Sequence, residues 1–492
     1  MATAPRDRLT DDQKFRLGPG APPGGLPRPT TASMRLVKRL TALMGVDRAV
    51  MYTVIWRSWM ALAAPINLLL VTRFLSPVAQ GFFYTFGSVL ALQVLFELGL
   101  TQLITQFASH ERSHLSWRTD GTLEGDGRAK SRLASLLRSA LTWYGLSSAL
   151  VIILLLTIGF WLFGLRSAAD TGVSWKVPWT LFVVFAGISF AFQPALAVLE
   201  GCGLVAEVAL MRVGQIITSS AAMWLVLWRG GELLALVAVK GAEMVWILSW
   251  MAFRNRAVLL DLVKTRPGAR AIHWRQEVWP VQWRTALTWA SSILILPVFN
   301  PLLFAFKGPA AAGRMGLSIS MVVTINTIGL AWITTRAPTF GALIARRDFR
   351  GLDGVFFPAL VKSTVVVIAA GVAVIVGTVY LHHINHPWSQ RILDPLPMAL
   401  LVSTTVVLHL IYSQAAYLRA HKAEPLVAAA VGAGLATGAA SYLLVGPFGA
   451  TGICLGFLTC MLVYLHLTHR IFNQKRREWH TDPAAERSGV SS

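Results

Sequence analysis

Among the charged residues inside apolar runs of the sequence, four stand out: Arg57, Glu97, Lys240 and Glu243. A charge in the hydrocarbon core of a bilayer costs about 2.5–3.5 kcal/mol on insertion scales, so each should face a partner or a water-filled cavity. Lys240 and Glu243 are three residues apart, which places them on one face of a helix where they can neutralise each other. Glu97 can pair with Arg57 or bind a coupling cation, and both roles stay open.

Two arginines, Arg57 and Arg284, fall in the first turns of the first and the seventh apolar run. A long cationic side chain at such a position can extend to lipid phosphates at the membrane surface. Lysine would fill that role equally well. Alternatively, both guanidinium groups face a cleft and bind an anionic ligand with their planar, permanently charged forks.

Two prolines, Pro65 and Pro297, lie inside the same first and seventh runs. A proline lacks a backbone N–H and its ring clashes with the preceding turn, so it bends a helix. Paired bends in corresponding helices are what a pair of gates requires. We therefore predict a gating role for both prolines, with helix packing as the alternative.

Motifs of enzyme chemistry are absent from the sequence, which contains no nucleophile elbow, P-loop or HExxH zinc motif. Three histidines, His382, His383 and His386, have few acids nearby, so no metal site is predicted there. The sequence predicts a protein that is not an enzyme, needs no cofactor and does not use ATP directly.

The composition is that of a membrane protein. Of the 492 residues, 55% are hydrophobic and only 14% are charged, and the mean hydropathy is +0.58. A chain this apolar and this long is expected to cross a membrane several times. The formal charge of +21 does not indicate nucleic acid, because the basic residues lie in short segments between apolar runs, where they meet anionic membrane lipid.

A membrane helix needs about 20 apolar residues. Twelve segments meet this requirement: 52–72, 82–104, 136–164, 177–198, 206–228, 232–252, 283–306, 315–335, 356–380, 396–418, 424–445 and 448–469. With the N-terminus in the cytoplasm, this threading places 33 Lys and Arg residues inside and 7 outside. Because cytoplasmic loops are rich in basic residues, the asymmetry predicts that both termini are cytoplasmic. The twelve helical spans predict an all-α fold.

The segments around the spans complete the predicted organisation. Residues 1–33 lack apolar periodicity and are expected to form a disordered tail. An interfacial helix then leads into a first six-helix bundle, the whole unit spanning 34–252. A cytoplasmic linker, 253–280, joins it to a second six-helix bundle, 281–470. Residues 471–492 are expected to form a second, cytoplasmic tail.

The two predicted bundles share a sequence pattern, P-x11-P-x3-G. It occurs at Pro65, Pro77 and Gly81 and again at Pro297, Pro309 and Gly313. Such recurrence indicates an internal repeat of six spans in the same orientation. We therefore expect two related bundles with a cleft between them.

The stretch RFLSPVAQGFFYTFGSVLALQVLFELGL, which starts at Arg73, resembles the opening of polysaccharide-biosynthesis membrane proteins. Their first helix typically ends in a similar R-[YF]-L-[ST]-P-x-x-x-G turn. These proteins are O-antigen-flippase-like members of the multidrug, oligosaccharidyl-lipid and polysaccharide flippase superfamily. The resemblance implies twelve to fourteen helices in two bundles, and alternating-access transport of polyprenyl-pyrophosphate-linked oligosaccharide across the cell inner membrane.

In such flippases a cationic cavity receives the pyrophosphate and the sugars. The resemblance suggests Arg57 and Arg284 at the mouth of this cavity, with Lys240 deeper. The acids Glu97 and Glu243 depart from a purely anion-binding cavity, which makes them candidates for charge pairing or for a coupling ion, H⁺ or Na⁺. A polysaccharide polymerase is a candidate partner.

Two other functions stay open. A cation or drug antiporter of the multidrug and toxin extrusion type needs a membrane acid that exchanges H⁺ or Na⁺, and Glu97 or Glu243 can serve. A membrane glycosyltransferase or polysaccharide polymerase needs a sizeable extramembrane catalytic segment, whereas the longest predicted outer segment, near 381–395, has about fifteen residues.

Overall fold

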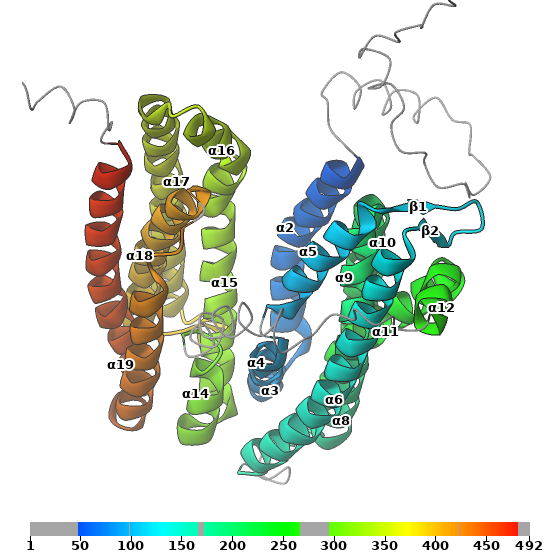
Figure 1. The fold of residues 1–492 in the computed structure, drawn as a ribbon. Coiled ribbons are helices and arrows are strands. Elements are labelled where there is room, and N and C mark those ends of the chain that lie inside the picture. The colour runs from blue at the N-terminus through cyan, green and yellow to red at the C-terminus, as the bar shows by residue number, and fades with distance from the viewer. Residues whose placement is uncertain (1–47, 98, 166–171, 266–294, 422, 481–492) are drawn as a thin grey trace, which may run out of the picture.

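The computed structural model of the protein describes residues 48–97, 99–165, 172–265, 295–421 and 423–480 (Figure 1). The first half contains α2 (Arg48–Phe74), α3 (Pro77–Leu90), η2 (Ala91–Gln93), α4 (Val94–Glu97), α5 (Leu100–Arg112), β1 (Leu115–Trp117), β2 (Leu123–Gly125), α6 (Gly127–Gly164), α8 (Lys176–Ala191), α9 (Gln193–Leu199), η3 (Glu200–Leu204), α10 (Val205–Trp228), α11 (Leu234–Phe253) and α12 (Arg256–Lys264). The second half contains α14 (Phe299–Lys307), α15 (Pro309–Thr334), α16 (Ala337–Ala345), α17 (Phe349–His383), η5 (Pro387–Arg391), α18 (Pro395–Ala420) and α19 (Val427–His480).

Nine helices among the described residues are long and apolar enough to cross a membrane. Two of them, Lys176–Trp228 and Val427–His480, each contain two predicted spans, so these nine helices account for eleven spans. Gly203, with a φ of 92°, and Gly449, with a φ of 56°, mark the junctions inside these two helices. Only the last part of the seventh span is described, as α14. The prediction of an all-α polytopic protein built from two helical bundles is confirmed.

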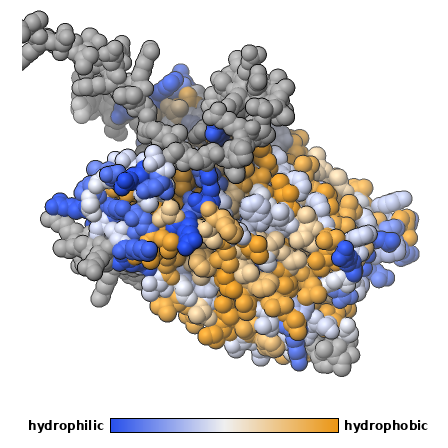
Figure 2. Space-filling model, turned by 90° about the vertical axis from the view of Figure 1, so that its right-hand side faces the viewer, coloured by the Kyte–Doolittle hydropathy of each residue, from blue (hydrophilic) through white to orange (hydrophobic). Residues whose placement is uncertain are grey.

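The connections between helices alternate between two ends of the molecule (Figure 1). The start of α2, the β1–β2 hairpin and the connection from α16 to α17 lie at one end, and the connections from α2 to α3 and from α14 to α15 lie at the other. The first end carries segments predicted to be cytoplasmic, so we call it the inner end and the opposite one the outer end. Figure 2 shows a face whose middle is apolar and whose hydrophilic residues gather toward the edges, as a bilayer-spanning surface requires.

The assignment of the two ends predicts an accessibility pattern. In a background without the three native cysteines, a cysteine at Ser389 of η5 should react with an impermeant thiol reagent added outside intact cells. A cysteine at Arg347, which is exposed between α16 and α17, should react only after the membrane is opened. Labelling of Arg347Cys and not Ser389Cys in intact cells would invert the topology.

The second predicted span, 82–104, is not one helix, which corrects the sequence-based expectation. α3 gives way to η2 and α4, and α5 starts after Gly99, whose φ of 69° is left-handed. Glycine has no Cβ and adopts this conformation at low cost, so a helix can end there. The break places Glu97 at the end of a short helix inside the membrane.

The predicted linker, 253–280, begins with helix α12, and its part from residue 266 lies outside the described residues. α12 packs on α6: the Lys130 ammonium lies 2.8 Å from the Asp261 carboxylate, and Arg138 donates to the carbonyl of Val263 at 3.1 Å. This part of the linker therefore belongs to the first half. The predicted tail 1–33 and the interfacial helix up to residue 47 also lie outside the described residues.

The second half is fastened at its inner end by a polar cluster. Asp353 of α17 accepts a hydrogen bond from the Tyr417 hydroxyl at 3.0 Å and forms an ion pair with Arg476. The ring of His480 lies 3.0 Å from the same hydroxyl. These contacts hold the end of α19 against α17 and α18, so residues 471–480 of the predicted cytoplasmic tail continue this helix.

Candidate functional site

The two halves meet along a seam between α3 of the first half and α15 of the second. Each helix starts with a proline, Pro77 or Pro309, and carries a glycine four residues later, Gly81 or Gly313. A Cβ on Gly81 would lie 1.9 Å from the carbonyl oxygen of Pro309, and one on Gly313 would lie 2.8 Å from the backbone nitrogen of Gly81. The motif repeated in the sequence thus packs on itself, and glycine is required because any side chain would overlap the other backbone.

A buried polar contact joins the halves at the same level. Gln80, which is 1% exposed, donates from Nε2 to the carbonyl of Gly313 at 2.8 Å and to that of Arg391 at 3.0 Å. The Arg391 guanidinium donates to the carbonyl of Leu75 and lies 3.4 Å from Oε1 of Gln80. Burial lowers the pKa of Arg391 from its ordinary value, but a guanidinium stays charged in proteins. We call this arrangement the Gln80–Arg391 latch.

Further contacts extend the closure deeper into the membrane. Asn300 of α14 donates from Nδ2 to the Ser88 hydroxyl of α3 at 2.9 Å. The rings of Phe82 and Phe304 meet edge to face, with centroids 4.9 Å apart. These contacts lie toward the outer end of the seam, whereas the helices of the two halves diverge toward the inner end (Figure 1). The structure is therefore closed on its outer side.

Arg57 is exposed on α2 and makes no hydrogen bond or ion pair within the part of the chain that the structure describes. α2 faces α10 with Trp59, whose indole donates to Ser220 at 3.2 Å, and with Asn67, which accepts from Trp224 at 2.6 Å. Arg57 precedes Trp59 by two residues, which is about 200° around the helix. Its side chain therefore points away from α10.

The same face of α2 reaches the second half further along the helix. Leu68 and Thr72 line a cavity of about 300 Å³ together with residues of α15 and α17. Arg57 lies eleven residues before Leu68, which corresponds to about 20° around the helix axis and about 16 Å along it. Arg57 is thus on the seam side of α2, nearer to the inner end. Arg284, its predicted counterpart, lies outside the described residues.

The structure brings Lys240 and Glu243 together, as their spacing predicts. The ammonium nitrogen lies 2.6 Å from Oε2 of the carboxylate, and about one quarter of each side chain is exposed. The pair is therefore largely neutral as a unit. While it is intact, Glu243 is not free to exchange a cation.

Glu97 lies at the helix break after α4. The Thr101 hydroxyl donates to its Oε1 at 2.9 Å, and this hydroxyl lies 3.1 Å from that of the buried Tyr144. The alternative of an ion pair with Arg57 is not seen, since neither residue has an ion pair within the described ranges. A carboxylate with hydroxyl neighbours at a break in a membrane helix is an arrangement suited to a coupling ion.

The two prolines differ in their surroundings. Pro65 lies inside the continuous helix α2. Pro297 lies in a turn directly before α14, so within the described residues it precedes a helix and does not lie inside one. The residues up to 294 are outside the described range, and the pairing of two bends stays a prediction.

Sequence reasoning missed the Gln80–Arg391 latch. It placed Arg391 only in an outer segment and assigned no role to Gln80. One signal was present, because Gln80 is a polar residue between Pro77 and Gly81 in the repeated turn, at the start of an otherwise apolar run. The corresponding position of the second copy is Ala312, so the repeat gave no indication that a polar residue is needed at this position.

Comparisons with known proteins identify the fold. No family model matches the sequence, and no curated protein is significantly similar to it. The lipid II flippase MurJ in an inward closed conformation matches with a TM-score of 0.62 and 12% identity, over 86% of this chain and 87% of that one. An inward-facing multidrug resistance transporter of the MATE family matches with a TM-score of 0.57 and 13% identity, over 87% of this chain and 99% of that one.

A third match is a MOP-superfamily transporter from Pyrococcus furiosus, whose description names a reverse polarity of its binding pocket. It matches with a TM-score of 0.54 and 13% identity, over 88% of this chain and 96% of that one. The chain therefore has the fold shared by multidrug transporters of the MOP superfamily and by a lipid II flippase. Identities this low show the fold alone.

Proposed function

We propose that this protein is an alternating-access transporter that moves polyprenyl-pyrophosphate-linked oligosaccharide from the cytoplasmic to the outer leaflet of the cell membrane. The fold supports transport by two bundles that rock about a central seam. The observation that carries the choice of substrate is Arg57, an unpaired cation on the seam side of α2, where the halves diverge toward the inner end. Such a position suits an anionic headgroup arriving from the cytoplasm.

The chemistry of the headgroup explains why a cation is needed. A pyrophosphate bearing sugars is polyanionic and strongly hydrated, so it crosses hydrocarbon only where protein donors replace water. Arginine provides two parallel hydrogen bonds to phosphate oxygens and remains charged. We propose that Arg57 and Arg284 bind the pyrophosphate together and that Lys240 contributes when its pair with Glu243 opens. The lipid tail stays in an apolar environment beside the seam.

A second candidate function is a cation or drug antiporter, and Glu97 is the observation that favours it. Of the two acids singled out as ion-coupling candidates, Glu243 is paired with Lys240, whereas Glu97 has no ion pair among the described residues. In an antiporter, this carboxylate would bind substrate cation and H⁺ or Na⁺ in turn. In the proposed flippase, it binds only the coupling ion.

Replacing Glu97 by glutamine is expected to abolish the response of transport to an H⁺ or Na⁺ gradient, because the amide keeps the size but loses the charge. Transport rates in vesicles with and without each gradient measure the effect. Glu232→Gln, at the exposed connection before α11, is the matched control and should respond as the unmodified protein does. A normal gradient response in Glu97→Gln would remove Glu97 from the coupling site.

Pro65→Ala is expected to slow transport while leaving the amount of membrane-inserted protein nearly unchanged. Without the proline, the missing N–H is restored and α2 can straighten, which alters the movement of the seam face. The rate of transport per inserted molecule measures the effect, and Pro297→Ala tests the second half. Normal rates in both variants would make the two prolines packing features.

A strain that lacks the protein provides the cellular test. It should accumulate the lipid-linked oligosaccharide on the cytoplasmic side and lose surface polysaccharide, and a plasmid copy should restore both. Unchanged surface polysaccharide in the deletion strain would count against the flippase assignment.

A further inference from the structure

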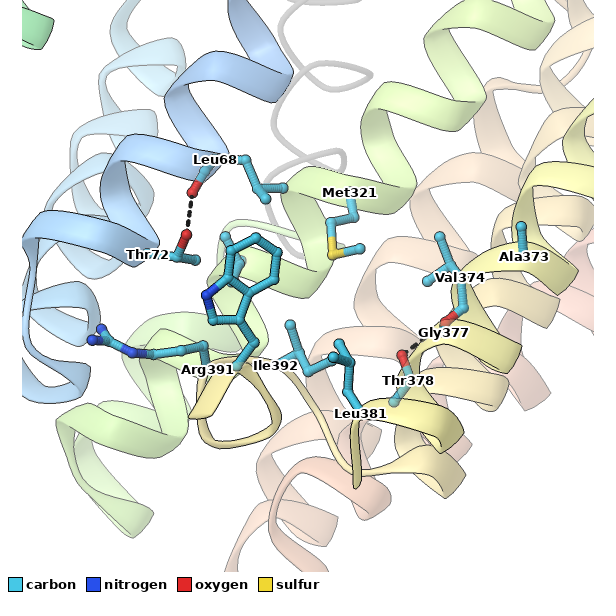
Figure 3. A pocket seen from close by; sticks show the side chains of 12 residues that line it. Leu68, Thr72, Met321, Ala373, Val374, Gly377, Thr378, Leu381, Arg391 and Ile392 are labelled. Atoms are coloured by element: carbon cyan, nitrogen blue, oxygen red, sulfur yellow. Dashed lines mark hydrogen bonds between the residues drawn. The ribbon is translucent and has the colours of Figure 1, made fainter. Parts of the chain in front are cut away.

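A groove lies between the two halves, toward the outer end of the molecule (Figure 3). Its cavity of about 300 Å³ is bounded by Leu68 and Thr72 of α2, by Leu317 and Met321 of α15, and by residues of α17 and η5. One wall therefore comes from the first half and the others from the second. An occupant of this groove would touch both parts that move relative to each other.

The walls of the groove are almost entirely hydrocarbon, and the polar side chains that line it include Trp388 and Arg391. The Thr72 hydroxyl donates to the carbonyl of Leu68 at 3.0 Å, and the Thr378 hydroxyl donates to that of Val374 at 2.8 Å. The Arg391 guanidinium is directed out of the groove toward α3, where it forms the latch (Figure 3). No carboxylate is among the residues that line the cavity. An organic cation would thus find no counter-charge here, whereas a hydrocarbon chain gains free energy by burying apolar surface against these walls.

We propose that this groove binds the hydrocarbon tail of the transported lipid, an inference that rests on the proposed flippase function. Arg57 lies on the same face of α2 as Leu68, about 16 Å closer to the inner end. A lipid whose headgroup is held at Arg57 on the inner side directs its tail along this face toward the outer side, where the groove begins. The wall also includes Trp388 and Ile392, which flank Arg391, so a bound tail contacts the loop that carries the latch.

The groove has room that a substitution can remove. A Cβ added to Gly377, one of the lining residues, would have no neighbour within 4 Å. The Cβ of Gly377→Leu therefore meets no neighbour, and the rest of the side chain should occupy the groove and slow translocation several-fold. Gly432→Leu is the matched control, since Gly432 is an exposed membrane glycine of α19 with equally open surroundings and lies away from the groove.

Photo-crosslinking identifies the occupant. A benzophenone amino acid is placed at Val374, which lines the groove, or at Val376, which is 61% exposed and does not line it. The protein is reconstituted in phospholipid vesicles that contain a polyprenyl-pyrophosphate oligosaccharide, irradiated, and its adducts are identified by mass spectrometry. The ratio of polyprenyl to phospholipid adducts should be several-fold higher at Val374. Phospholipid adducts at Val376 serve as the reference for bulk lipid.

Equal ratios at the two positions, or phospholipid enrichment at Val374, would overturn the inference. Translocation by the unmodified protein is measured in the same vesicles, so the two proposals fail in different ways. Normal translocation with equal ratios removes the groove and leaves the flippase function intact. Absence of translocation contradicts the proposed function itself. Normal translocation by Gly377→Leu would also contradict tail binding in the groove.

Discussion

Gly81→Ala is expected to force open the outer end of the seam. Its Cβ would lie 1.9 Å from the carbonyl oxygen of Pro309, and a backbone atom cannot turn aside as a flexible side chain can. Overpacking of this kind costs about 1–3 kcal/mol. In the proposed alternating-access cycle this contact exists only when the outer side is closed, so its cost should shift the conformational equilibrium toward the outward-open state by roughly 5- to 150-fold.

A cysteine reporter at Ser318 measures this shift. Ser318 is fully buried on α15 and accepts a hydrogen bond from Leu393, so it becomes accessible from outside only when the seam opens. Labelling of Ser318Cys by an impermeant reagent should rise in the Gly81→Ala background. Gly87→Ala is the matched control, because a Cβ at this position of the same helix has no neighbour within 4 Å. Equal labelling in both backgrounds would show that the glycine contact does not govern closure.

Arg57→Ala is expected to reduce translocation roughly tenfold to a hundredfold, which is the loss of a hydrogen-bonded charge contact of about 1.5–3 kcal/mol. Arg57→Lys should restore part of the activity, since lysine keeps the charge but lacks the planar fork. The same pair of substitutions at Arg284 tests its proposed role. Rates are normalised to the amount of inserted protein.

Arg73→Ala is the matched control for this series. Arg73 is an exposed arginine in the last turn of the same helix, at the outer end, and its loss should change the rate little. If Arg57 only extends to lipid phosphates, lysine will replace it fully. Full activity in an Arg57→Ala, Arg284→Ala double variant would end the assignment of the pyrophosphate site.

The sequence predicted the parts of the fold that depend on local physics. The length of the apolar runs predicted the spans, and the spacing of Lys240 and Glu243 predicted their ion pair. The repeated proline and glycine predicted a relation between the halves, although not that Gly81 and Gly313 would touch each other. A glycine in a repeated turn indicates a conformational or packing requirement without naming the partner.

Other features depend on contacts between distant parts of the chain. The latch joins Gln80 to Arg391, which are separated by 311 residues, and no periodicity links them. The break at Gly99 was not predicted, because the run 82–104 is mostly apolar and apolar length alone predicts a continuous helix. The position of Arg57 on the seam side follows from the contacts of Trp59 and Asn67 with α10, which join residues more than 150 positions apart and leave no local pattern in the sequence.

The central claim is that the seam moves a lipid-linked pyrophosphate and not a free cation. The direct measurement uses purified protein in sealed vesicles that contain a polyprenyl-pyrophosphate oligosaccharide, with an impermeant enzyme that modifies the sugars only on one leaflet. A parallel set of vesicles reports exchange of a fluorescent organic cation against H⁺ or Na⁺. We predict that the oligosaccharide reaches the enzyme faster than in protein-free vesicles. This acceleration should be abolished in the Arg57→Ala, Arg284→Ala double variant. The parallel vesicles should show no cation exchange. Cation exchange without acceleration of lipid translocation would contradict the flippase account and establish the antiporter.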